Sequence, residues 1–494
     1  GAAWPAWQAA RMSVVRALAS RAAPPRRRTL MLVSAAGAAG VLIQLSIVLI
    51  PTDAQTVFWA YATLGLPAMF IGYFLLSVPL ALLLARLLGP ALTRLHRLPP
   101  SLLGPTIRQT PYRHGFTSGA MMVGLAMMVE IWSVGGAFLR DWLTKVEFPD
   151  AFVSGLALPP EARDTIESLE FVERTSVISQ HIIEVDAFGV QALQRYTSWF
   201  FAFEPDSFFD MAEITFVDGD AETARRRLNE GGAVIVAREF QIAKGLGAGD
   251  DFTFTHEGEE HTLEIVGVVT SPGLELASKF FNIGEDFTNQ AIHAVFGSRG
   301  DAKRLFNADA VQLIQVDLTE DIDDAEAVQR LREAVFGLGV LDVGSGRMIK
   351  DQLRVFVHGM LLVFSSVAIG AMLVACLGVA NLIIAGIEAR RFEFGVLRSV
   401  GAGRALLVRL IAGEAVIIAL GAAILGSLMG LQGSLAAMRL YAMLLGIEFT
   451  PRPPFAALAI GWGVVLLITL AAATPAILRL NRRRPLELLA SISG

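Results

Sequence analysis

A short arginine-rich stretch, Glu388 to Arg404, lies between two long apolar runs of the sequence. Its apolar residues Phe394, Leu397 and Val400 recur at roughly helical spacing, so we expect a short amphipathic helix that ends at Gly401. Its charged face consists of Arg390, Arg391, Glu393 and Arg398. Such side chains bind a protein partner through ion pairs and hydrogen bonds. Two interpretations remain open: a helix that a cytosolic partner grips, or an ordinary cytoplasmic loop, which is basic in most membrane proteins.

Three ionisable residues, Glu130, His358 and Glu414, fall within or near apolar runs. Charge at membrane depth is costly and usually functional, which makes a proton relay one interpretation. Arg409 lies roughly 140° from Glu414 around a helix, so a partner on another span or a position near the interface is the alternative for Glu414. Glu130 and His358 are a candidate pair near the outer leaflet.

The sequence lacks the patterns of an enzyme. It contains no Ser/His/Asp, Cys/His or metal-ligand spacing and no Walker A motif, so we expect no catalytic residue, no metal site and no ATP hydrolysis in this chain. The glycine-rich segment Gly245 to Asp250 follows a helix and precedes no Lys-Ser/Thr, which favours a structural turn over a nucleotide site.

Composition separates a membrane part from a water-exposed part. The chain has 494 residues, of which 54% are hydrophobic, and a single cysteine, Cys376, which excludes an internal disulfide. Between Arg140 and Lys350 lie 38 of the 46 acidic residues but only 18 of the 41 basic ones, so this segment carries −20 and the remainder +15. This split predicts an acidic extracytoplasmic domain and basic cytoplasmic loops.

Six apolar runs are long enough to cross a bilayer. With both termini in the cytoplasm, only Arg354, Arg439 and Arg452 of the basic residues beyond the acidic domain fall outside. We therefore divide the chain into a lead-in (1–29), a transmembrane hairpin (30–88), a cytoplasmic loop with an amphipathic helix (89–115), span 3 (116–139), the extracytoplasmic domain (140–350), span 4 with an outer stalk (351–387), the arginine-rich segment (388–404), span 5 (405–438), an outer loop (439–454), span 6 (455–478) and a cytoplasmic tail (479–494).

The acidic domain alternates strand and helix signals, which predicts an α+β fold. We expect strands at 151–155, 171–179, 182–188 and 311–318, and helices at 160–169 and 323–336. Phe252–Thr255 and His261–Thr270 are separated by His256-Glu-Gly-Glu-Glu and read as a hairpin.

An aromatic stretch, Tyr196 to Met211, has two interpretations. Its rings either form a surface for an amphiphile or a partner, or they belong to the domain core or rest on the membrane. The candidate surface residues are Trp199, Phe200, Phe201, Phe203, Phe208 and Phe209, together with Phe280 and Phe281.

The arginine-rich segment resembles the coupling-helix signature of the FtsX-like permease family, which includes MacB-type and lipoprotein-releasing ABC transporters. The matching residues are Arg390, Glu393, Gly395, Leu397, Arg398, Gly401 and Ala402, followed by Glu414-Ala415. Ala389 stands where the family's first glutamate is usual, with Glu388 one residue early, and Ser399 where alanine is common. The tail Arg482 to Leu489 is similar to the family's C-terminal ending. Residues 102–491 would form one such module, and the preceding hairpin suggests the second half of a ten-span permease or a distinct six-span version.

The resemblance implies an α-helical membrane protein of six spans with a MacB-like periplasmic core domain between spans 3 and 4. It would be the non-catalytic permease subunit of a bacterial inner-membrane ABC transporter, moving or extracting a lipid, lipoprotein, peptide or hydrophobic compound by mechanotransmission. The coupling residues would be Glu388, Arg390, Arg391, Glu393, Gly395, Leu397, Arg398, Gly401 and Arg404.

The implied partners are an ABC ATPase that binds ATP and Mg, a second permease copy or half, membrane lipids, and an extracytoplasmic adaptor or lipoprotein, with no nucleic acid. The alternatives are a non-transporting regulator that activates an extracytoplasmic cell-wall hydrolase, and a stand-alone multi-pass receptor.

Overall fold

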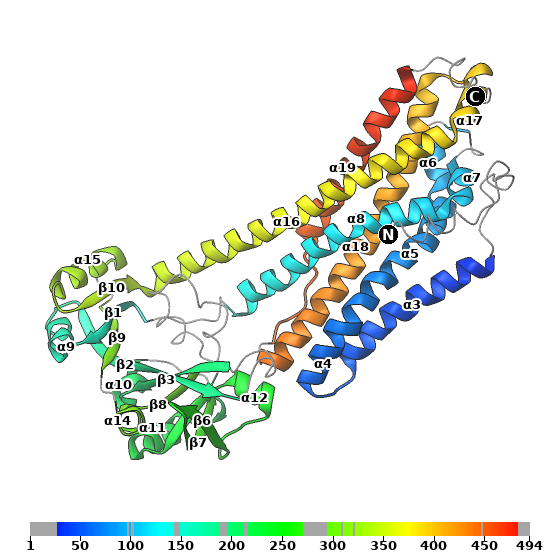
Figure 1. The fold of residues 1–494 in the computed structure, drawn as a ribbon. Helices are drawn as coiled ribbons and strands as arrows, with labels where there is room; N and C mark the ends of the chain where they lie inside the picture. Colours follow the sequence, from blue (N-terminus) through cyan, green and yellow to red (C-terminus); the bar gives the residue numbers. More distant parts are fainter. Residues whose placement is uncertain are drawn as a thin grey trace.

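The computed structural model contains a helical bundle and one sheet-containing domain (Figure 1). It describes residues 27–95, 98–99, 103–142, 149–186, 196–211, 216–269, 294–307, 310–319, 322–445 and 448–482.

Six helical segments among these residues are long and apolar enough to cross a membrane. They are formed by α3 (Arg27–Leu49); α4 (Ala54–Ala60), the π-helical η1 (Tyr61–Gly65) and α5 (Leu66–Leu87); α8 (Pro111–Ala137) with the π-helical η2 (Phe138–Trp142); α16 (Gly346–Ala389); α18 (Arg404–Leu445); and α19 (Phe455–Arg482). The sheet-containing domain lies between the third and fourth segments. This arrangement confirms the predicted fold class.

Glycines bring the first hairpin and the rest of the bundle into backbone contact. A Cβ added to Gly40 of α3 would lie 2.5 Å from the Ala68 carbonyl of α5, and one on Gly115 of α8 would lie 2.6 Å from Val78 Cα of α5. Small residues permit such approach, and close packing is what holds membrane helices together. The hairpin is therefore packed directly onto the other spans.

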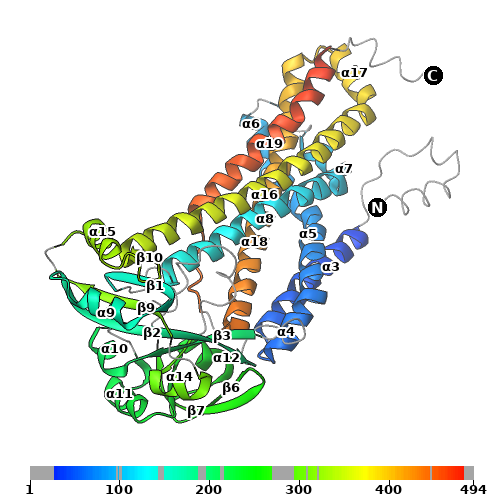
Figure 2. The same cartoon turned by 60° about the vertical axis from the view of Figure 1, so that its left-hand side comes forward.

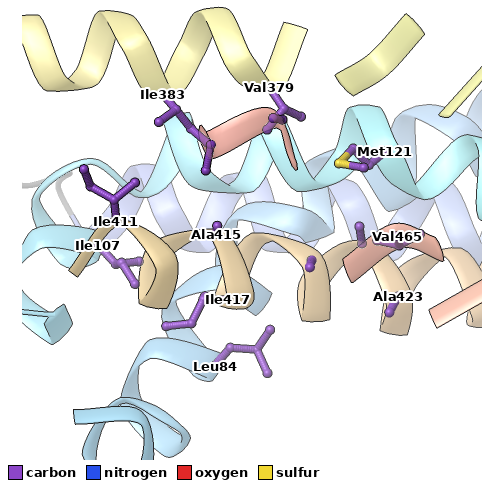
Figure 3. Packing of buried hydrophobic residues seen from close by; sticks show 14 of the residues in the cluster. Leu84, Ile107, Met121, Val379, Ile383, Ile411, Ala415, Ile417, Ala423 and Val465 are labelled. Carbon is purple, nitrogen blue, oxygen red and sulfur yellow. The ribbon is translucent and has the colours of Figure 1, made fainter. Parts of the chain in front are cut away.

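Helix α18 is the centre of the bundle. In the most apolar 18-residue stretch of α18, 67% of the residues are buried. The corresponding stretches of α3 and α16 are 17% and 22% buried. A Cβ on Gly430 would lie 2.6 Å from the Ala126 carbonyl of α8. Figure 3 shows the apolar core around α18, to which Leu84 of α5, Val379 of α16 and Val465 of α19 contribute.

The short helices lie at one end of the bundle and the sheet-containing domain lies at the other. Helices α6 (Gly89–Leu95), α7 (Leu103–Gln109) and α17 (Arg391–Ser399) are at the end away from the sheet, whereas α4 lies toward it (Figures 1 and 2). The two ends of the bundle therefore carry different elements.

One ten-stranded mixed sheet forms the second domain, in the order β10-β1-β9-β2-β3-β8-β5-β7-β4, with β6 paired to β2 and β7. The strands are β1 (Ala151–Leu158), β2 (Val172–Val185), β3 (Tyr196–Phe203), β4 (Phe216–Gly219), β5 (Ala233–Ala237), β6 (Asp251–His256), β7 (Glu259–Val269), β8 (Ala294–Ser298), β9 (Val311–Leu318) and β10 (Val340–Ser345). The helices are α9 (Pro160–Glu167), α10 (Pro205–Met211), α11 (Ala221–Glu230), α12 (Arg238–Lys244), α14 (Arg299–Phe306) and α15 (Asp324–Ala334).

Two strand predictions have different outcomes. The β6–β7 hairpin is confirmed, and its turn places Glu257 and Gly258 at φ 49° and 88°. The two strands expected at 171–179 and 182–188 are instead the single strand β2, because Gln180 and His181 continue the ladder opposite Phe201 and Phe200.

Helix α16 joins the two domains without a break. Ser345, the last residue of β10, caps the helix by accepting a hydrogen bond from the Met348 N–H at 3.1 Å. The helix has 44 residues, a length of about 66 Å at 1.5 Å per residue, which is roughly twice the bilayer core. It runs from the sheet past α8 and α19 to α17 (Figure 2).

Candidate functional site

The arginine-rich segment folds as helix α17 between two sharp breaks. Arg390, at φ −104° and ψ 17°, ends α16 and precedes α17. Gly401, at φ +100°, adopts a conformation that only glycine reaches without strain, and it separates α17 from α18. The helix is shorter than the predicted segment, because Glu388 belongs to α16 and Arg404 begins α18.

One face of α17 is packed and the other is open. Phe394 and Gly395 are buried against the bundle. On the open face Phe392, Val396 and Val400 are 46%, 40% and 83% exposed. The prediction that Val400 shares the packed face with Phe394 is wrong, because α17 ends at Ser399 and Val400 follows the helix as an exposed residue. An exposed apolar face on a short helix is typical of a protein docking surface.

A buried ion pair ties the start of α17 to the central helix. The Arg390 guanidinium donates two hydrogen bonds to the Glu414 carboxylate of α18, at 2.8 and 2.9 Å. The two side chains are 14% and 6% exposed, and the Arg390 Nε–H also donates to the Gly386 carbonyl at 3.3 Å. Two parallel hydrogen bonds fix orientation as well as distance. The pair therefore fixes the start of α17 against α18.

A second arginine reaches the same carboxylate from α8. Arg113 Nη2 lies 3.9 Å from Glu414 Oε2. Its guanidinium lies against Gly386 of α16, where any Cβ would collide with it. The cluster of Arg113, Gly386, Arg390 and Glu414 thus connects α8, α16, α17 and α18 at one level of the bundle.

The other segment residues are spread around this cluster. Glu388 forms an ion pair with Arg391 at 3.9 Å, and Leu397 packs on the core. Arg404 is exposed, as is Glu393 in the first turn of α17. None of these arrangements supplies a nucleophile. The described residues also contain no group of three or more side chains that could hold a metal ion.

The two remaining intramembrane residues do not form the expected pair. Glu130 of α8 faces α18, where a Cβ on Gly433 would lie 2.9 Å from its Oε2. His358 is exposed on α16, and its Nδ1 lies 2.8 Å from the Arg354 carbonyl oxygen. Within the described residues no ion pair joins the two side chains, so this prediction is wrong.

The aromatic stretch forms part of the domain core. Phe200, Phe201, Phe203 and Phe208 are at most 3% exposed, and Phe203 stacks on Phe208 at 3.9 Å between ring centroids. Their interpretation as a substrate surface is wrong, because β3 lies inside the sheet between β2 and β8 and is covered on both faces. Trp199 and Phe209 are partly buried. Phe280 and Phe281 lie outside the described residues.

A second junction, absent from the sequence-based predictions, lies at the opposite end of the bundle. Glu448 in the α18–α19 connection forms an ion pair with Arg238 of α12 at 2.9 Å. Two residues later the Thr450 N–H donates to Asp141 of η2 at 2.7 Å. The sheet domain therefore also contacts the bundle away from α16, at the end opposite α17. No sequence motif includes these residues. Arg113 was not predicted as a site residue either, although its position at the same membrane level as the carboxylate of Glu414 is the signal that could have identified it.

Comparison with known proteins identifies part of this architecture. Residues 365–485 match the family model described as FtsX-like permease C-terminal. This range contains α17, Arg390 and Glu414. No curated protein sequence matches the chain.

Two solved structures of extracytoplasmic regions are similar to the chain. One is the periplasmic region of MacB from Actinobacillus actinomycetemcomitans, at 9% identity and a TM-score of 0.29, covering 44% of this chain and 97% of that one. The other is the extracellular domain of the noncanonic ABC-type transporter YknZ from Gram-positive bacteria, at 11% identity and a TM-score of 0.27, covering 40% and 98%. The resemblance predicted from Arg390 to Ala402 is confirmed by the family match over residues 365–485: this is a multi-pass membrane protein whose C-terminal part is similar to the FtsX-like permease family.

Proposed function

We propose that this chain is the permease subunit of an ABC-type transporter and that α17 is where a separate ATPase subunit engages it. The observation that carries the proposal is the Arg390–Glu414 pair, which ties a helix with an open apolar face to the most enclosed span. A docking helix without a rigid connection would move alone. Here its movement is shared with α18 and, through Gly386 and Arg113, with α16 and α8.

Two routes carry this movement to the sheet domain. The first is α16, which continues from the cluster to the edge strand β10. The second is α18, whose connection to α19 holds Arg238 of α12 through Glu448. In this mechanism the ATPase binds ATP and Mg and hydrolyses ATP, and this chain transmits the resulting motion. We further propose that a second permease copy or half completes the assembly.

The proposal also fixes orientation. The end with α17 and both termini lie in the cytoplasm of a bacterial-type inner membrane, and the sheet domain lies outside. Val400 and Leu156, 83% and 78% exposed, test this assignment when each is replaced by cysteine in a Cys376→Ser background. A membrane-impermeant maleimide added to intact cells is expected to label Leu156→Cys alone. Labelling of both from the same side would overturn the mechanism.

The cargo classes are a lipid, lipoprotein, peptide or hydrophobic compound. The phenylalanines of the aromatic stretch are buried, so they do not form the surface on which an amphiphile was expected to bind. That observation favours keeping a second candidate function, a non-transporting regulator that activates an extracytoplasmic partner such as a cell-wall hydrolase. The two are distinguished by whether ATP hydrolysis by the purified complex responds to an amphiphile or only to a protein partner.

Docking of the ATPase is tested on the open face of α17. Val396→Asp places a charge in an apolar contact without altering the packed face, and it is expected to abolish co-purification of the ATPase and ATP hydrolysis by the complex. Leu95→Asp is the matched control, because Leu95 is 75% exposed on α6 at the same end of the bundle. Equal ATPase retention in both variants would refute α17 as the docking site.

A further inference from the structure

Glu130 and Glu414, both within membrane spans, have opposite surroundings. Glu414 of α18 accepts two hydrogen bonds from Arg390 and lies 3.9 Å from Arg113. No hydrogen bond or ion pair of the Glu130 carboxylate occurs among the described residues. An ionised carboxylate with neither is costly to hold in a medium of low polarity. Glu130 therefore requires a proton or a cation from elsewhere.

Glu130 lies near the sheet end of the membrane core. It is about 26 Å along α8 from Arg113, the cation at the other end of that helix, and the core of a bilayer is about 30 Å thick. Trp59, 42% exposed on α4 at the sheet end, is typical of the level of the lipid headgroups. Since Glu130 is also partly exposed, a headgroup of the adjoining leaflet can reach its carboxylate.

The cations that follow on the two adjacent helices do not neutralise this carboxylate. Arg140 lies about 15 Å further along the same helical segment and pairs with Asp141 at 3.2 Å. Arg439 of α18 lies about 9 Å beyond Gly433, the glycine beside the carboxylate, and roughly 120° around that helix. Neither arginine forms an ion pair with Glu130 in the part of the chain that the structure describes.

The groups beside Glu130 suit an ammonium ion. A Cβ on Gly433 would lie 2.9 Å from Glu130 Oε2, so α18 presents a glycine to the carboxylate instead of a competing side chain. Tyr61 lies within electrostatic range of Glu130. It begins the π-helical turn η1, and such turns are frequent at functional sites. A carboxylate accepts hydrogen bonds from an ammonium group, and an aromatic face attracts its charge.

We propose that Glu130 and Tyr61 bind the primary ammonium of an amphiphile in the adjoining leaflet, with phosphatidylethanolamine as the simplest example. The ammonium neutralises the carboxylate and donates hydrogen bonds to it. A quaternary ammonium supplies the charge but no N–H group, and an anionic headgroup is repelled. A free amine in water lacks the acyl chains that hold a lipid beside the site. The inference goes beyond the proposed function, because binding of the headgroup requires no ATPase and its failure would leave the docking of α17 untouched.

Headgroup binding is measured on the full-length chain in detergent by native mass spectrometry. Phosphatidylethanolamine, phosphatidylcholine and phosphatidylglycerol with identical acyl chains are titrated in turn, and the wild-type affinity is expected to fall in that order. Glu130→Gln is expected to weaken binding of phosphatidylethanolamine about 10- to 100-fold, the effect of losing a hydrogen bond to a charged group. Asp53→Asn is the matched control, since it removes an exposed carboxylate at the same end of the bundle and asparagine still caps α4. Equal binding by Glu130→Gln and the wild type would overturn the proposal.

The aromatic side of the site is tested without changing the carboxylate. Tyr61→Leu is expected to weaken binding of phosphatidylethanolamine about 3- to 10-fold, whereas Tyr61→Phe retains the ring and is expected to keep most of the affinity. A wild-type chain without preference for phosphatidylethanolamine over phosphatidylglycerol would mean that Glu130 is simply protonated. Displacement of the lipid by an equal concentration of free ethanolamine would mean that the ligand is an aqueous amine. Either result would contradict an amphiphile as the occupant.

Discussion

Replacing Glu414 with glutamine is expected to release α17 from the bundle while leaving the sheet domain intact. Glutamine keeps the shape of the side chain but removes the charge that Arg390 and Arg113 share. Loss of one partner from a buried ion pair costs about 3–5 kcal/mol. Since glutamine retains one acceptor, we take about 2 kcal/mol as the lower limit. That corresponds to roughly 30-fold more frequent opening of α17.

Hydrogen exchange by mass spectrometry on the full-length protein measures this opening directly. Amides of residues 391–399 are expected to exchange roughly 30-fold faster in Glu414→Gln, while those of β5 and β9 keep their wild-type rates. Glu448→Gln is the matched control, because its pair with Arg238 is 55% and 43% exposed and such pairs contribute about 0–1 kcal/mol. Exchange of α17 at the wild-type rate in Glu414→Gln would refute the argument that the ion pair holds this helix.

Three further outcomes are expected. Burial lowers the pKa of His181 from 6.5 to about 4; the unfolded chain then binds more protons between these values, so the thermal stability of the sheet domain is expected to fall as pH decreases from 6.5 to 4 and to level off below. Phe203→Ala opens a core cavity and is expected to destabilise that domain by about 3–5 kcal/mol in chemical denaturation, with a smaller loss for the partly buried Phe209→Ala. Gly430→Leu prevents the close approach of α18 to α8 and is expected to abolish recovery of folded protein in detergent, whereas Gly463→Leu, with open space at its Cβ, is expected to be tolerated.

Local patterns were enough to predict the six spans and several elements of the sheet domain, although β4, β8 and β10 were not predicted. Apolar run length fixes where spans lie, because only a helix satisfies its own backbone hydrogen bonds in lipid. The hairpin of β6 and β7 follows from alternation around a Glu-Gly turn. Strand β9 begins and ends at its predicted residues, Val311 and Leu318.

What the sequence did not predict is which elements become neighbours. Arg113 and Glu414 are far apart in the chain, and nothing local indicates that α8 and α18 meet at that level. The aromatic residues of β3 read equally well as surface or core, and only the position of the strand inside the sheet decides for burial. Likewise, whether Val400 is packed or exposed depends on where α17 ends, and periodicity defines helix ends poorly.

The ten-stranded sheet is continuous, and it is attached to the bundle near both of its ends. Strand β10 at one edge runs directly into α16, and α12, which follows β5 toward the other edge, is held through Arg238 and Glu448. In the mechanism proposed above, a movement of α16 is expected to carry the whole sheet with its β10 edge, because no break separates β10 from the helix. The exposed Arg238–Glu448 pair is the weaker attachment and is expected to yield first, so a probe on α12 would report the relative motion of sheet and bundle.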